Sequence, residues 1–435
     1  MSRIVVVGGG WAGCAAALSA HQAGAEVILL ERTDSLLGTG QVGGIMRNNG
    51  RFTAAEEMLA MGGGELFHLT DENARHTGVE FPGHHHANLY DVSTMEAKAR
   101  RYLQNQGVQI WLVARVTKVT ATEGVIQAVQ TEDGDLIEGD VFVDTTGTMG
   151  PQANCTKYGN GCAMCMTRCP TFGPRVSLTG KLGVQEWMVK RADGSFGAMS
   201  GSCKLNRESL DHGLIAELER CGSAVVPIPP VLHTELAAKE EKLLAVKCCQ
   251  QYALPEFANN VVLLDTGHIK LMAPFYPLMD LRRIPGLENA RYEDPYSGGI
   301  GNSIRFLAMA PRNDALQVQG VRNLFCGGEK TGPLVGHTEA ISTGTLAGYN
   351  AVRLALNEPL LQLPRSTAVG EMIAYTGEQI KLQEVGFKKF TFSGSVFFDR
   401  MKQLGLYTTD RNQIQERIRA AGLEGVFARH EPIPA

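Results

Sequence analysis

The sequence predicts an α/β fold in which a Rossmann-like domain is interrupted by an inserted domain. A buried-strand pattern at residues 3–7 runs directly into a glycine-rich turn and a small-residue helix. Residues 321–332 are a second strand pattern that runs into a glycine turn, and a helix pattern then reaches Leu354. Between residues 155 and about 285 no alternation of strand and helix is evident. We therefore expect one dinucleotide-binding domain built from two distant stretches of chain.

The N-terminal turn matches G-x-G-x-x-G at Gly8, Gly10 and Gly13. The first glycine allows the tight turn, the second lets a pyrophosphate approach the backbone, and the third lets helix and strand pack closely. The free N–H groups of the following helix attract phosphates. A second strand pattern ends at Glu31, whose carboxylate can accept hydrogen bonds from adenosine ribose hydroxyls. Together these pieces predict dinucleotide binding.

The later motif favours FAD over NAD as that dinucleotide. NAD-binding domains commonly continue as an unbroken βαβαβ unit, whereas here the second strand opens into a glycine-bearing stretch at 38–44. An acid at the ribose also argues against NADP. Residues 321–344 resemble the second flavin-contacting motif of flavoproteins of the two-dinucleotide-domain type. Residues 141–147 resemble the strand and turn that close the FAD half in those proteins.

We expect the backbone of Val116 to meet the adenine, and residues 328–338 with Gly344 to line the flavin and the ribityl chain. No residue stands out as a catalytic base, so the catalytic residues stay unknown at this point. The residues expected to bind FAD are Gly8, Gly10, Gly13, Glu31, Arg32, Gly44, Val116, Thr146, Gly147, Gly328, Glu329, Gly336, His337, Thr338 and Gly344.

Four segments are expected along the chain. Residues 1–150 and 287–360 form the two parts of the FAD-binding domain, and residues 151–286 form an inserted β-rich or α+β substrate domain. Residues 361–435 form a small C-terminal helical appendage. Within the first part, residues 53–69 have a helical pattern in which Thr53 and Glu56 are spaced as a capping box.

Four cysteines follow soon after the turn at Gly147. They are Cys155, Cys162, Cys165 and Cys169. Residues 162–170 resemble the closing half of the bacterial ferredoxin run, C-x2-C-x3-C-P, and such close spacing suits a [4Fe-4S] cluster. Zinc usually draws two C-x2-C pairs across a longer loop. A zinc site, redox-active thiols and inert cysteines stay open as alternatives, and Cys203 or Cys221 could replace Cys155 as the fourth ligand.

A cluster beside a flavin has a plain use, because clusters pass single electrons and flavins exchange one or two. The first hypothesis is therefore an FAD-dependent oxidoreductase that passes electrons between a [4Fe-4S] cluster and FAD. Its redox partner or small-molecule substrate is not identified by the sequence. A non-enzymatic flavin subunit for electron transfer or redox sensing is a further alternative.

Three consecutive histidines, His84, His85 and His86, cannot all share one face of a helix or strand. We interpret them as a polar loop. A role as a flavin-adjacent acid or base is the alternative, since histidine titrates near neutral pH.

Composition and charge restrict the class of protein. A formal net charge of −4 gives no overall attraction to nucleic acid or to anionic membranes. The apolar run at residues 4–20 has the outline of a secretory signal, but the glycines inside it favour a strand, a turn and a helix. We expect a cytoplasmic protein without membrane attachment that forms homo-oligomers.

Residues 283–290, with the sequence RIPGLENA, look like a stretch of the GidA-type flavoproteins. These include the folate-dependent tRNA uridine methyltransferases (TrmFO) and the carboxymethylaminomethyl-uridine enzymes (MnmG). Residues 324–351 and 363–375 are similar to theirs as well. The resemblance implies an FAD-dependent tRNA uridine-modifying enzyme, with tRNA as the partner, as the alternative function.

The chain departs from that family's pattern at two places. TrmFO proteins carry a cysteine in a C-S-N-S segment soon after the second strand, whereas residues 46–50 contain none. The four-cysteine run belongs to neither the TrmFO nor the MnmG pattern. Residues 381–435 hold nine Lys and Arg against six Asp and Glu, which is a modest basic excess, more typical of a solvated surface than of an RNA site.

Overall fold

The computed structural model describes residues 1–148, 168–188, 198–200, 202–232, 255–273, 276–293, 303–305, 308–382 and 389–428. No helix in these ranges is long and apolar enough to cross a bilayer. The helices are α1 (Trp11–Gln22), α2 (Gly40–Gly43), α3 (Gly50–Ala60), α4 (Glu65–Glu72), α5 (Met95–Gln106), α7 (Cys169–Phe172), α8 (Leu178–Lys181), α9 (His212–Cys221), α11 (Pro255–Asn259), α12 (Leu278–Leu281), α13 (His337–Ala355), α14 (Ala368–Leu382), α15 (Ser395–Gln403) and α16 (Arg411–Ala420), with 3₁₀ turns η1 (Arg207–Ser209) and η3 (Gly328–Thr331). The strands are β1 (Arg3–Val7), β2 (Glu26–Leu30), β3 (Ile45–Met46), β4 (Ala74–Phe81), β5 (His84–Tyr90), β6 (Gln109–Trp111), β7 (Val116–Thr122), β8 (Val125–Thr131), β9 (Leu136–Glu138), β10 (Val141–Asp144), β11 (Trp187–Met188), β12 (Ala198–Ser200), β13 (Cys203–Leu205), β14 (Ser223–Pro227), β15 (Asn260–Thr266), β16 (His268–Leu271), β17 (Ser303–Arg305), β18 (Ala308–Met309) and β19 (Leu324–Cys326).

A five-stranded parallel sheet with the order β19-β10-β1-β2-β6 forms the centre of the molecule. Strand β1 is central, and because successive side chains of a strand point to opposite faces, it supplies both cores. Ile4 and Val6 pack with α1 and α13 on one face, and Val5 and Val7 pack toward β7, β8 and β9 on the other. Strands from two distant stretches of the chain thus share one sheet, and the predicted Rossmann-like α/β fold is confirmed.

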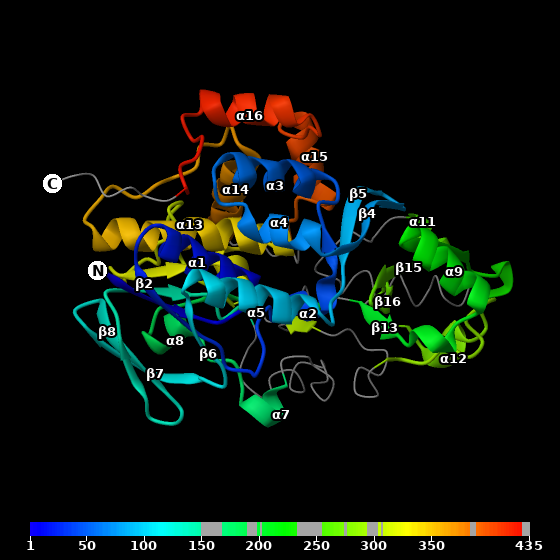
Figure 1. Cartoon of the computed structure of the whole chain (residues 1–435), viewed down its shortest axis with the longest axis horizontal. Helices are drawn as coiled ribbons and strands as arrows, with labels where there is room; N and C mark the ends of the chain where they lie inside the picture. The colour runs from blue at the N-terminus through cyan, green and yellow to red at the C-terminus, as the bar shows by residue number, and fades with distance from the viewer. Residues whose placement is uncertain are drawn as a thin grey trace.

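Helices α1 and α13 lie against one another on the same face of this sheet (Figure 1). Small residues make their backbones approach closely: a Cβ atom at Gly344 or Gly348 would overlap the carbonyl oxygen of Ala12 or Ala16, respectively. Since both helices begin at the carboxyl edge of the sheet, this crossing brings the N-terminus of α13 beside that of α1.

A second, antiparallel sheet has the order β13-β16-β15-β14. Helices α9 and α12 cover one of its faces in a separate apolar core, which extends to Tyr292. The other face, with Val262 and Leu264, packs on the small sheet β3-β5-β4 through Phe81 and Leu89. In Figure 1 this unit lies to the right of the parallel sheet, and β4 and β5 reach across to it.

The helical pattern at 53–69 is two helices, not one. Helix α3 begins at Gly50, three residues before the expected cap, and the chain turns at 62–64 before α4. The predicted capping box is wrong, because the Thr53 hydroxyl donates to the carbonyl of Thr408 at 2.7 Å instead. Helices α14, α15 and α16 lie together beside α3 (Figure 1), and Glu57 of α3 pairs with Arg417 of α16 at 3.0 Å.

Substitution of Gly344 by alanine tests the close helix crossing. The added Cβ would overlap a backbone oxygen of α1, so we expect a loss of about 1–3 kcal/mol in the free energy of unfolding. Chemical denaturation measures it. Gly180→Ala is the control, because this exposed glycine has only ordinary contact distances around its Cβ position. Equal stability of both variants would contradict the crossing geometry.

Candidate functional site

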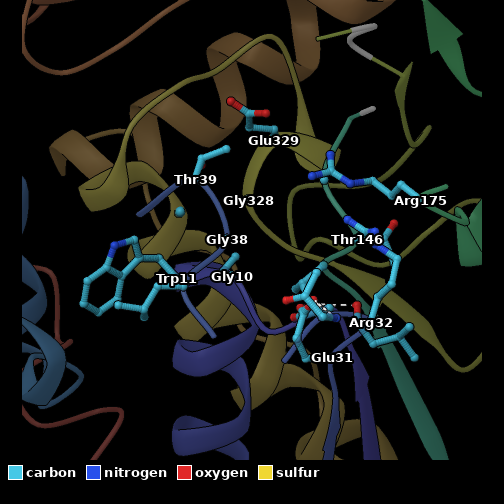
Figure 2. Close-up of a pocket in the computed structure, with 18 of the residues that line it drawn as sticks. Gly10, Trp11, Glu31, Arg32, Gly38, Thr39, Thr146, Arg175, Gly328 and Glu329 are labelled. Carbon is cyan, nitrogen blue, oxygen red and sulfur yellow. Dashed lines mark hydrogen bonds between the residues drawn. The ribbon is translucent and has the colours of Figure 1, made fainter. Parts of the chain in front are cut away.

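One pocket opens where the carboxyl ends of β1, β2 and β10 meet the N-termini of α1 and α13 (Figure 2). It brings together most of the residues, from four separate motifs, that the sequence predicted to bind FAD. The predicted residues that line it are Gly8, Gly10, Glu31, Arg32, Val116, Thr146, Gly147, Gly328, Glu329, Gly336 and His337.

Four nominated residues lie behind the pocket wall. Gly13 packs against the carbonyl of Gly8, and Gly344 lies in the α1–α13 crossing. Gly44 has a left-handed conformation beside Thr266, and Thr338 is fully buried. Each supports an element that lines the pocket, but none of them is in its lining.

The glycine turn is shaped for an anion. Gly8 has φ +105°, and a Cβ there would lie 2.5 Å from the carbonyl oxygen of Thr145, which directly follows β10. A Cβ at Gly10 would meet no atom within 4 Å, so this residue borders open space. Gly10 is also the N-cap of α1, and no side chain caps that helix. The N–H groups and the positive end of the helix dipole therefore face the pocket.

The Glu31 carboxylate is held by the backbone on both oxygens. Its Oε2 accepts from the Gly9 N–H at 2.6 Å and its Oε1 accepts from the Thr33 N–H at 2.8 Å. A carboxylate oxygen has two lone pairs, so each retains one for a second donor. The buried carboxylate is thus fixed on the pocket wall, where ribose hydroxyls could donate to it.

Asp144, at the end of β10, organises the opposite wall. Its fully buried carboxylate accepts from the N–H and the hydroxyl of Thr146 and from those of Thr179, at 2.7–3.1 Å. Burial by itself raises the pKa of Asp144, but Lys330 at 4.0 Å and these hydrogen bonds outweigh it and hold that pKa below its usual value. The buried ammonium of Lys330 also contacts Ser177 and Glu186.

Glu329 and His337 stand on the late motif. Lys389 and the hydroxyl of Thr148 hold the Glu329 carboxylate, both at 3.0 Å. The His337 ring lies 3.3 Å from the hydroxyl of Tyr90, which also donates to Gly40 O at 2.6 Å. These contacts join the start of α13 to the α2 turn.

The sequence reading missed several residues of the lining. Three arginines reach the pocket from outside the glycine motifs, and no local pattern marks them. Trp11 lies within the glycine motif itself, at the start of α1. Its place in that motif is the one sequence signal that could have predicted it as a lining residue. The missed residues include Trp11, Thr39, Gln41, Arg115, Arg168 and Arg175.

Two lysines of the antiparallel sheet hold the α2 turn from behind. Lys270 donates to the carbonyl of Val42 at 2.9 Å, and Lys204, its neighbour across β13 and β16, donates to Gln41 O at 3.3 Å. Burial, and then the charges of Lys204 and Arg51, lower the pKa of Lys270 to about 7. The second sheet is thereby connected to the pocket wall by both lysines, and the ammonium of Lys270 is poorly solvated.

None of the three adjacent histidines lines the pocket. They start strand β5 and do not form the polar loop that we expected. His84 is buried, stacks on Phe81 and lies 3.0 Å from the Asn48 amide, whereas His85 is exposed.

Of the four cysteines predicted to bind a cluster, one lies in the part of the chain that the structure describes. Cys169 starts α7 and is half-buried, while Cys155, Cys162 and Cys165 lie outside the described residues. Cys203 is buried in the second core, and Cys221 is exposed at the end of α9. In the part of the chain that the structure describes, no group of three or more Cys, His, Asp or Glu is placed to hold a metal ion.

These features fit FAD. An uncapped helix N-terminus and a glycine turn suit the pyrophosphate, and a fixed carboxylate at the end of β2 suits the ribose. Bound FAD would supply two-electron chemistry, and the surrounding residues bind it and orient it.

Comparison with known proteins agrees with this pocket. The model of the family described as "Glucose inhibited division protein A" matches residues 3–243 and 278–359. The chain belongs to the GidA family. Membership confirms the predicted resemblance to flavoproteins of the GidA/TrmFO type. The two matched stretches contain both walls of the pocket. The match does not bear on an iron–sulfur cluster.

Individual relatives match over shorter lengths. The methylenetetrahydrofolate–tRNA-(uracil-5-)-methyltransferase TrmFO of Enterococcus faecalis is 38% identical over 97 residues, which are 22% of this chain and 21% of TrmFO. The Bacillus subtilis TrmFO is 36% identical over 98 residues, with the same shares. The chain thus spans about a fifth of the length of these relatives. GidA of Aquifex aeolicus, at 17% identity, has the same fold, with a TM-score of 0.67 over 97% of this chain and 74% of GidA.

The lowered pKa of Lys270 predicts a pH-dependent stability. Its folded-state pKa of about 7 lies below its ordinary value of 10.5, so the unfolded chain binds more protons between these pH values. Stability should therefore rise with pH in that window, by up to about 1.4 kcal/mol per pH unit. Lys270→Met should remove that rise, measured by urea unfolding from about pH 6.5 to pH 9.5. Lys402→Met, a change at an exposed lysine, is the control, and an unchanged slope in Lys270→Met would refute the shift.

Proposed function

We propose that this flavoprotein is an FAD-dependent oxidoreductase that modifies a uridine base in tRNA. The observation that carries the proposal is the GidA family match across both walls of the pocket. The TrmFO relatives, named for transfer to uracil-5 in tRNA, support the choice of substrate. The redox partner and the predicted homo-oligomer stay predictions.

Within the pocket, we propose that Gly8 and Gly10 hold the pyrophosphate and that Glu31 holds the adenosine ribose. Val116 would meet the adenine through its backbone. Glu329 and the start of α13 would face the ribityl chain and the flavin. The geometry of the glycine turn, the two backbone donors to Glu31 and the ion pair of Glu329 support these roles.

Residues 46–50 contain no cysteine, so this segment cannot supply the thiol that TrmFO proteins carry there. Arg47 is buried there between Asp71 and Glu56, at 2.5 and 2.6 Å, and Asn48 contacts His84. These side chains are structural. We therefore propose a flavin redox step on the uridine or on its carbon donor, without a thiol nucleophile from this segment.

The C-terminal appendage is a poor candidate for the tRNA surface. Each described Lys or Arg between residues 389 and 428 lies within ion-pair distance of a carboxylate, so little positive charge is left for phosphates. Phosphate contacts must then come from other parts of the chain, and we expect few of them.

Purified tRNA should bind the FAD-loaded protein at low salt. Because phosphate contacts release counterions, binding should weaken about tenfold or more between about 50 and 200 mM salt. Gel shift or filter binding measures this, with single-stranded DNA of the same length as the control. Deletion of the gene should remove one modified uridine from total tRNA in mass spectrometry. Absence of tRNA binding together with an unchanged nucleoside profile would overturn the proposed substrate.

A second candidate function keeps the iron–sulfur hypothesis. The observation that favours it is the place of Cys169, the last cysteine of the run, directly after Arg168, which lines the pocket. The described end of the run therefore lies beside the pocket. We propose, as this second candidate, that Cys155, Cys162, Cys165 and Cys169 hold a [4Fe-4S] cluster that exchanges electrons with FAD.

Anaerobic purification tests the cluster. We expect about four irons and four sulfides per chain, with a broad absorption beneath the flavin bands. Cys169→Ser should lower the iron content. Cys221→Ser, at an exposed cysteine outside the run, should leave it unchanged if Cys155 is the fourth ligand and lower it if Cys221 takes that place. Stoichiometric zinc, or no metal in the wild-type protein, would overturn the cluster and leave the tRNA proposal standing.

A further inference from the structure

Residues 168–176, here called the strap, run along the mouth of the pocket. Arg168, Arg175 and Val176 of the strap line the pocket. The strap lies outside every glycine motif and ends where Ser177 caps α8. It joins the described end of the cysteine run to the wall that Asp144 organises.

Three arginines fasten the strap to the FAD-binding sheet. Arg32 donates to the carbonyl of Gly173 at 2.7 Å, and Arg115 donates to the carbonyl of Pro174 at 2.9 Å. From the strap itself, Arg168 pairs with Asp34 at 2.7 Å. The backbone at 173–174 is thus fixed by two neighbouring arginines at the end of β2 and the start of β7, and Arg175 follows immediately.

Arg175 projects from this fixed backbone onto the turn that follows β10. A Cβ at Gly147 would lie 2.5 Å from an Nη of Arg175, so the guanidinium rests on that glycine. Two residues earlier, the backbone of Thr145 meets Gly8. Gly8, Thr145–Gly147 and Arg175 therefore follow one another around the same end of the pocket.

The charged side chains around Gly147 favour binding of an anion. Burial, and next the charge of Arg175, lower the pKa of Arg32, which places the two guanidinium groups in each other's field. Figure 2 shows both side chains reaching into the pocket from the side opposite Trp11. Four arginines and two glutamates line the described pocket, and two of these arginines, Arg115 and Arg168, also pair with Glu132 and Asp34. The basic part of the lining is thus concentrated at Arg32 and Arg175. The pyrophosphate of FAD carries two negative charges.

We infer that Arg175 binds the pyrophosphate of FAD from the side opposite the Gly8–Gly10 turn, and that the strap is a cofactor clamp. Arg32 shares the same anion, while its bond to Gly173 keeps the strap in place. A guanidinium contributes charge-assisted hydrogen bonds to phosphate, so the clamp acts on FAD affinity. The inference concerns the cofactor and does not depend on which substrate the enzyme takes.

Titration of apoprotein with FAD, followed by quenching of flavin fluorescence, tests the clamp. Arg175→Ala should raise the Kd for FAD about tenfold or more. ADP, which has the pyrophosphate without the flavin, should lose affinity by the same factor, and riboflavin, which has no phosphate, should lose none. Arg175→Lys should restore part of the loss. Arg322→Ala, a change at an exposed arginine outside the pocket, is the control.

Unchanged FAD and ADP affinity in Arg175→Ala would overturn the clamp. Equal losses for riboflavin and FAD would overturn it too, because they would indicate a collapsed pocket, and the thermal unfolding midpoint of the apoprotein checks this directly. Wild-type protein that bound no FAD would overturn the cofactor itself and the clamp with it.

Discussion

The close contact between α1 and α13 is the constraint on which the site depends. The two helices come from distant parts of the chain, and glycines at 344 and 348 let their backbones touch at Ala12 and Ala16. This contact sets the N-terminus of one helix beside that of the other, at the edge where the parallel strands end. Two positive helix ends then face one pocket, so an anionic cofactor is favoured before any side chain contributes.

Sequence patterns revealed the backbone part of the site and much less of its side chains. G-x-G-x-x-G and Glu31 are local features, since turn, helix and acid are fixed by steric rules within about 30 residues. Arg175 and Lys270 have no such local signature, because each acts through a chain fold that brings distant segments together. The capping box at Thr53 failed for the same reason: a tertiary bond to Thr408 replaced the local one.

Part of the first 150 residues packs on the antiparallel sheet. Strands β3, β4 and β5 lie in the first 150 residues, yet Phe81 and Leu89 pack on the antiparallel sheet. An alternating strand pattern tells which face is apolar but not which sheet covers it. The consequence is functional, because the α2 turn beside β3 is held by lysines of that second sheet, so a movement of the second unit would reach the pocket wall directly.

The distribution of charge then separates the binding of cofactor from that of substrate. Arginines gather at the pyrophosphate end, whereas most basic side chains of the C-terminal appendage are neutralised by carboxylates. Charges inside a narrow pocket are weakly screened by salt, and those on a surface are strongly screened. FAD binding should therefore persist at ionic strengths that release a polyanionic substrate. Under the proposed function, the flavin would stay bound through each cycle while the tRNA leaves.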